Sequence, residues 1–196
     1  MHYRRIASFL LGLWLGGGLL MAWVAIDSFR SVNQLLAAPG PVVAIQIKAL
    51  GPGGAGALLR YQAAEQNRRY FETWEAVQLV LGAGFLSFLL FGSNEGKFSL
   101  LLLLLMFLIT AAQRFLVTPE LSALGRTFYF IPAGLPSVER NRFWMLHSVY
   151  TGSEILKWGL GVVLGILLVF NKPRRSPDAG HEFDVIDKAN HRHINR

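Results

Sequence analysis

The chain has 196 residues, of which 53% are hydrophobic and 16% are charged, and its formal net charge at pH 7 is +7. The charged fraction is below the roughly 25% of ordinary soluble domains, so the composition indicates a membrane protein. The chain contains no cysteine, which excludes disulfides, thiolate catalysis and cysteine-ligated metal centres. The positive charge suits residues that flank membrane spans, so we expect a lipid bilayer and not nucleic acid as the partner.

The first expected membrane span covers residues 6–27. Its charge-free stretch, residues 6–26, would form a helix of about 32 Å, enough to cross a hydrocarbon core of about 30 Å. Arg4 and Arg5 before this stretch also suit a secretory signal peptide. The apolar run is longer than that of such peptides and lacks a good cleavage site, so we expect a retained helix.

A long loop-side extension, residues 28–72, is expected before the second span, residues 73–92. Proline and glycine cluster in "AAPGPVV" and "LGPGGAGALL" within this extension, and such clusters predict breaks in regular structure. From about Leu58 the pattern becomes helical and continues into the span. This predicts one helix that projects well beyond the bilayer.

The third and fourth spans are expected at residues 98–117 and 147–170. A short polar link, residues 93–97, predicts a helical hairpin between the second and third spans, and a second loop is expected at 118–142. The charge-free end of the fourth span, from Trp158 to Phe170, is only about 20 Å long and too short to cross alone. Glu154 and Lys157 are therefore expected at or below the membrane boundary.

Together these elements predict an all-α integral membrane protein. We expect residues 1–172 to form an antiparallel bundle of four transmembrane helices, with the second helix extended beyond the bilayer. Residues 173–196 are expected to form a polar, flexible tail. The basic residues next to the helix ends, which decide orientation, favour a bacterial inner (cytoplasmic) membrane with both termini in the cytoplasm; they are Arg4, Arg5, Lys172, Arg174 and Arg175.

All four predicted helices bring polar residues to the loop-side boundary of the membrane. The candidate binding residues of this polar layer are Glu72, Glu75, Gln78, Gln113, Arg114, His147, Glu154 and Lys157. Ionisable groups at this depth must pair, because isolated charge in lipid is costly. The layer suits either a binding or translocation site above Glu154 and Lys157, or an ion-paired clamp that fixes helix register.

One stripe of the fourth span continues this polar layer into the membrane. On a helical wheel, His147, Thr151 and Glu154 share a face with Gly161 and Gly165. The two glycines form a small-xxx-small pair that lets a neighbouring helix approach closely. The stripe is therefore expected to face protein. A close helix contact also explains the glycines in "GLWLGGG" better than a nucleotide-binding loop does.

His147 is the histidine closest to a predicted span and is a candidate axial haem ligand or proton carrier. A hydrogen-bonding role at the membrane interface is the simpler alternative. His191 and His193 in the tail would bind metal weakly. The sequence contains no recognisable serine hydrolase, zinc protease or phosphate-loop motif, so no catalytic residue, metal site or confident cofactor is assigned.

Three stretches resemble the transmembrane protein 205-like family: "LLGLWLGGGLLMAWVAIDSFRSV", "TAAQRFLVTPELSALGR" and "RFWMLHSVYTGSEILK". Gln113, Arg114 and Pro119 match the family's exit from the third helix, and His147 matches its entry to the fourth. The resemblance covers most of residues 6–170. It implies a four-helix membrane domain without a settled activity, and a link of some relatives to drug or metal-compound resistance suggests small-molecule handling.

The leading functional hypothesis is a non-enzymatic membrane protein. It would be either a small-molecule or ion-handling module, as in transport, or an accessory subunit that binds other membrane-protein subunits or a second copy of itself. The alternative is a haem- or quinone-linked redox protein that uses His147.

Overall fold

The computed structural model describes residues 2–92, 96–128 and 137–170, and every regular element within them is helical. The expected tail at 173–196 lies outside these residues, as do positions 93–95 of the expected link. In chain order the elements are α1 (His2–Ala37), α2 (Pro41–Leu50), α3 (Pro52–Gly92), α4 (Lys97–Ala112), the π-helical turn η1 (Gln113–Val117), α5 (Thr118–Phe128) and α6 (Val138–Phe170).

Within the described part of the chain, four helical segments are long and apolar enough to cross a membrane. They are Tyr3–Ala37, Gly53–Gly92, Lys97–Thr127 and Val138–Phe170. Each contains most or all of one predicted span, so the expectation of an all-helical protein with four such helices is confirmed. With 36 and 41 residues, α1 and α3 extend about 54 and 61 Å, far beyond one hydrocarbon core.

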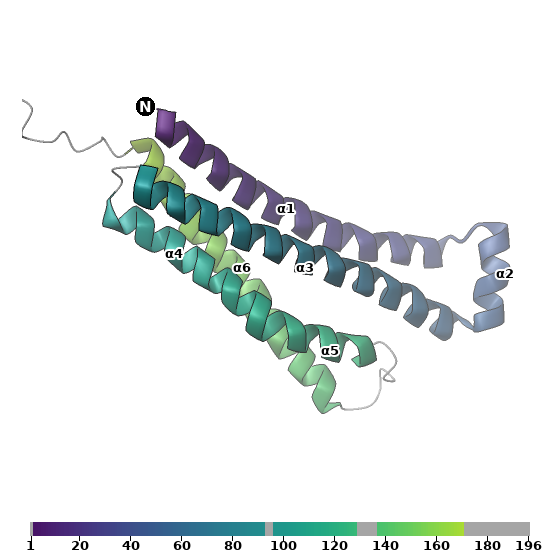
Figure 1. Cartoon of the computed structure of the whole chain (residues 1–196). Helices are drawn as coiled ribbons and strands as arrows, with labels where there is room; N and C mark the ends of the chain where they lie inside the picture. The colour runs from purple at the N-terminus through teal and green to yellow at the C-terminus, as the bar shows by residue number, and fades with distance from the viewer. Residues whose placement is uncertain (1, 93–95, 129–136, 171–196) are drawn as a thin grey trace, which may run out of the picture.

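The long helices pack through a connected set of contacts. α1 contacts α3 and α6, α4 contacts the same two helices, and α5 lies against α6. Figure 1 shows α1 and α3 side by side with α2 across their far end, and it shows the start of α1 near the end of α6. Towards α2, α5 and the start of α6 turn away from α1, so one end of the molecule is closely packed and the other is splayed.

The closely packed end contains the apolar core. Trp14 of α1, Phe85 of α3, Leu103 of α4 and Leu164 of α6 are at most 1% exposed and belong to one cluster. Among lipid-facing helices, dense van der Waals packing of this kind replaces the hydrophobic effect as the main force between helices. The core therefore fixes the relative positions of all four long helices.

Glycines bring α1 and α6 close together at the edge of this core that is nearer the splayed end of the molecule. A Cβ atom on Gly161 would lie 2.6 Å from Leu15 Cδ2, and one on Gly165 would lie 3.5 Å from Leu11 Cδ2. In the "GLWLGGG" run, Gly17 contacts the Trp74 ring and Gly18 contacts Trp158, whereas Gly12 and Gly16 face open space. The expected close helix contacts thus occur at the Gly161 pair and at half of the glycine run.

The prolines and glycines of residues 28–57 divide the helices where the sequence predicted an extended loop. α1 continues past the expected end at 27 to Ala37, and α3 begins at Pro52, before the expected Leu58. Pro41 stands in the first turn of α2, and Gly51 after its last turn has φ +73°. Proline suits a helix start and glycine a helix stop, so the clusters end one helix and begin the next.

The predicted loop at 118–142 is also partly helical. The chain passes from α4 through η1 into α5, and the Thr118 N–H donates to the carbonyl of Gln113, five residues back. Pro119 explains this wide turn, because its ring has no N–H and would clash with the carbonyl of Phe115 in a regular α-helix. α6 then begins at Val138, nine residues before the expected span.

Candidate functional site

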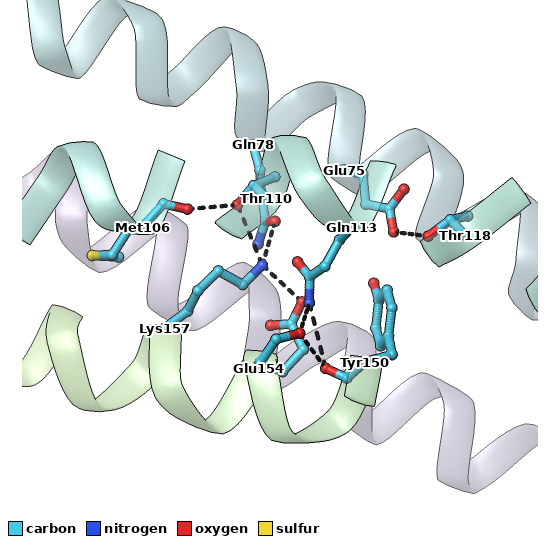
Figure 2. A network of polar contacts seen from close by, with 10 residues as sticks. Glu75, Gln78, Met106, Thr110, Gln113, Thr118, Tyr150, Glu154 and Lys157 are labelled. Carbon is cyan, nitrogen blue, oxygen red and sulfur yellow. Dashed lines mark hydrogen bonds and ion pairs between the residues drawn. The ribbon is translucent and has the colours of Figure 1, made fainter. Parts of the chain in front are cut away.

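Lys157 lies at the centre of a buried polar network. Its side chain is 1% exposed, and its Nζ lies 2.8 Å from Glu154 Oε1, 3.0 Å from Gln78 Oε1 and 3.4 Å from Thr110 Oγ1. These acceptors come from α6, α3 and α4, as Figure 2 shows. An ammonium group has three N–H donors, and each is matched by an acceptor. Lys157 therefore has no donor left for a ligand.

Gln113 extends the network along α6. Its Nε2 donates to Ser153 Oγ at 2.6 Å and approaches the Tyr150 carbonyl at 3.4 Å, while Ser153 Oγ donates to the same carbonyl at 2.7 Å. Tyr150, Ser153 and Lys157 stand at helical spacings of three and four, so they share one face of α6. This face is the one that packs against α3 and α4.

Glu75 is the most enclosed carboxylate of the network, with 0% exposure. Thr118 Oγ1 donates to its Oε1 at 2.6 Å, and Arg114 Nη1 lies 3.9 Å from its Oε2. Both partners stand in or next to η1. The extra residue of the π turn changes the side-chain directions that follow it, and it places Arg114 and Thr118 beside Glu75.

The two ion pairs balance the charge of the network. Each of the two carboxyl groups, Glu75 and Glu154, lies beside one basic side chain, Arg114 and Lys157 respectively, so the formal charges cancel. Buried ions that lose a partner destabilise a fold strongly, so α3, α4 and α6 are bound to one register. The geometry of the Lys157 network fits the ion-paired clamp better than it fits a ligand site.

The structure brings six of the eight predicted residues together: Glu75, Gln78, Gln113, Arg114, Glu154 and Lys157. Glu72 instead accepts a bond from Ser122 Oγ at 3.4 Å. His147 is exposed and stacks on Phe143 with ring centroids 6.0 Å apart. The sequence analysis missed the hydroxyl members Thr110, Thr118 and Ser153; small polar residues inside apolar helices are the signal that could have found them.

A groove of about 1110 Å³ lies beside this network, along a neighbouring face of α6. It is formed by the outer halves of α1 and α3, by α5 and by the first half of α6, where these helices splay. Its wall is mostly apolar, and its phenylalanine, tyrosine and tryptophan side chains are Phe29, Phe71, Trp74, Phe143, Trp144, Tyr150 and Trp158. Ligand pockets of about 300–1,000 Å³ are typical, so the groove is large enough for a sizeable molecule. We call it the α1–α6 groove.

The polar stripe predicted on α6 lines this groove. His147, Thr151, Glu154 and Trp158 all contribute to its wall. Three residues belong to both regions, because Thr118, Tyr150 and Glu154 line the groove and also join the Lys157 network. The stripe thus faces an open space between helices, and the expected protein contact begins only at Gly161.

Polar groups are distributed unevenly along the groove. Arg30 and Asn33 of α1 and Arg60 of α3 line its outer end, near α2, whereas Gly18 and Trp158 line its deep end. In residues 2–92, 96–128 and 137–170, no three His, Asp or Glu side chains come together in a way that would hold a metal ion. The groove therefore combines an apolar trunk with one basic end.

The fold and these two regions are compatible with the class of polytopic α-helical membrane proteins. Comparison with protein-family models, with curated proteins and with solved structures found no match. The resemblance to the transmembrane protein 205-like family remains a prediction.

Proposed function

We propose that the protein is a non-enzymatic, polytopic membrane protein that binds a small amphipathic molecule in the α1–α6 groove. The observation that carries this proposal is the groove itself: a space of about 1110 Å³ with an aromatic wall and one basic end. Pockets that are mostly apolar, with a few converging polar groups, are typical of small-molecule sites. Binding of this kind fits a transport or carrier role.

In this proposal the four long helices cross the bilayer as an antiparallel bundle. The apolar core surrounds Trp14 and Leu164 and would lie at membrane depth. The groove begins near Gly18 and Trp158 and rises to Arg30 and Arg60, so it would run from the acyl chains to the aqueous side. The basic residues at the chain ends favour cytoplasmic termini in an inner membrane.

The Lys157 network has a supporting role in this proposal. It fixes α3, α4 and α6 to one another through Gln78, Thr110 and Glu154. α1 supplies none of these partners. Beyond its contact with Gly161, towards α2, it forms the groove wall that faces this three-helix unit. A rigid three-helix unit beside a separate wall suits a site that must admit a ligand.

Filling the groove with a bulky side chain tests the proposal. Ala22 lines the groove, and Ala22→Trp would occupy the space of the ligand. Full-length protein purified in mild detergent is extracted with organic solvent, and mass spectrometry identifies the co-purified small molecules. We expect wild type to carry an amphipathic molecule in near-stoichiometric amount and Ala22→Trp to lose most of it.

Leu19→Trp is the matched control, since Leu19 is on the same helix, is 55% exposed and does not line the groove. This variant is expected to retain the molecule. Equal amounts of co-purified molecule in Ala22→Trp and Leu19→Trp would contradict the proposal. Wild-type protein that carries no molecule and does not bind added lipid would also contradict it. If native mass spectrometry instead shows a stable complex with another membrane protein seated over the groove, the accessory-subunit role replaces it.

The redox alternative depends on His147, whose side chain lies on the groove wall beside Phe143 and Trp144. A haem with His147 as axial ligand would give a Soret absorption band. A band that disappears in His147→Ala would support this alternative, and a colourless preparation would exclude the haem. A quinone would be found among the extracted molecules.

A further inference from the structure

We propose that the ligand of the α1–α6 groove is an anionic lipid whose headgroup binds Arg30 and Arg60. This inference rests on the proposed function and specifies the ligand of the same groove. It follows from the charge at the groove's outer end, from the pairing of the neighbouring basic residues and from the length of the apolar trunk below them.

Three arginines line the groove, and they differ in their partners. Arg68 is bound to Glu65 through Nε at 3.0 Å and through Nη2. In the described part of the chain, Arg30 and Arg60 form no ion pair with a carboxylate. The positive charge of Arg68 is therefore offset within the protein, whereas the other two charges are available to a ligand.

Arg30 of α1 and Arg60 of α3 line the outer end of the groove on two neighbouring helices. Arg60 Nη2 of α3 donates to Asn33 Oδ1 of α1 at 3.4 Å, and Arg30 precedes Asn33 by about one helical turn on the same face of α1. Arg30, Asn33 and Arg60 thus line the same outer part of the groove. Guanidinium groups bind phosphate oxygens in a bidentate geometry, which makes arginine the residue best suited to a phosphate headgroup.

The trunk below this position matches a lipid chain. From Arg30 to Gly18, α1 descends twelve residues, or about 18 Å, close to the roughly 15 Å thickness of one leaflet of a hydrocarbon core. Met21, Ala22 and Phe29 line it on α1. Glu154 also lines the groove, below its basic end, but its charge is offset by Lys157. The charges available to an anionic headgroup therefore lie at the outer end.

The test compares two lipids with identical acyl chains, phosphatidylglycerol and phosphatidylcholine. Their dissociation constants for the full-length protein are measured in detergent by native mass spectrometry. We expect phosphatidylglycerol to bind about tenfold more tightly, because each basic residue near an anionic headgroup contributes attraction. In the double variant Arg30→Gln with Arg60→Gln, the preference should fall to about twofold or less.

A second double variant, Lys48→Gln with Arg69→Gln, controls for net charge. Both residues are exposed and neither lines the groove, so the tenfold preference should remain. Circular dichroism and gel filtration check that both variants fold. Equal affinity of wild type for the two lipids, with both displaced by Ala22→Trp, would overturn the anionic headgroup but leave the proposed function intact. Binding of both lipids that Ala22→Trp leaves unchanged would overturn the groove as the site.

Discussion

The two faces of α6 differ in what they do with polar residues. On one face, Lys157 is 1% exposed and all three of its donors have acceptors. On the other face, His147 and Thr151 are exposed on the wall of a groove of about 1110 Å³. The distance to the neighbouring helix therefore decides the role of a polar residue on α6. Where the neighbour is close, the residue bonds to it and holds the fold together; where the neighbour is distant, the residue can contact a ligand.

The distance between neighbours has a local cause on each face. α3 and α4 lie close enough to Lys157 for Gln78 and Thr110 to reach it. α1 touches α6 at Gly161, where the absence of a side chain on α6 lets Leu15 of α1 pack against its backbone, and then diverges towards α2. The groove begins where this close glycine contact ends.

The largest effect is expected from removing the Lys157 ammonium group from its buried network. Lys157→Met with Glu154 unchanged leaves a largely buried carboxylate without its ion-pair partner, and we expect the free energy of unfolding to fall by about 3–5 kcal/mol. Denaturant titration of the protein in detergent, followed by circular dichroism, measures the change.

The double variant Lys157→Met with Glu154→Gln removes both charges and should recover much of this loss. It should also keep the bound amphiphile, because the groove wall remains. If the single and double variants are equally damaged, Lys157 and Glu154 are not energetic partners, and the clamp would have to depend on other contacts.

A smaller effect is expected at Thr118, which belongs to both regions. Thr118→Val keeps the shape of the side chain but removes the hydroxyl bonded to the buried Glu75 carboxylate, so we expect a loss of about 1.5–3 kcal/mol in the free energy of unfolding. Thr127→Val is the control, since Thr127 is exposed and bonds to a nearby carbonyl; its change should stay within about 0.5 kcal/mol. Similar losses in both variants would show that the Glu75 contact is unimportant.

The smallest effect is expected at the contact between α1 and α6. Gly161→Leu would push Leu15 aside, and we expect a loss of about 1–2 kcal/mol, because the tip of Leu15 can move. A leucine at Gly159, which has nothing within 4 Å, should leave the free energy of unfolding unchanged or raise it, since leucine favours helix. Thermal unfolding in detergent measures both, and a harmless Gly161→Leu would mean that α1 is not held there.

The sequence predicted the burial of Lys157 for a sound physical reason. The charge-free end of α6 is too short to cross a membrane, so the charged residues before it had to be sheltered. Helical periodicity also placed His147, Thr151 and Glu154 on one face, and they share the groove wall. Both results depend on helix geometry alone, which a sequence specifies well.

Two features of the fold were not predicted, and they have different causes. Pro41 and Gly51 looked like loop residues, yet they begin and end α2, because the same residue types that break a helix also cap one. The groove wall on α1, with Ala22 and Phe29 at helical spacing, was not foreseen. The sequence of one helix does not show where a neighbouring helix diverges from it. A helix face that lines a groove therefore has the same sequence pattern as a face that packs against protein.

Cysteine labelling tests the difference between the two faces most directly, because the chain has no cysteine of its own. Thr151→Cys stands on the groove wall and Thr110→Cys stands in the Lys157 network, where Thr110 is 0% exposed. With a water-soluble maleimide and folded protein in detergent, we expect rapid labelling at 151 that added amphiphile slows, and labelling at 110 only after unfolding. Equal labelling at both positions, or labelling at 151 that no amphiphile changes, would contradict the account.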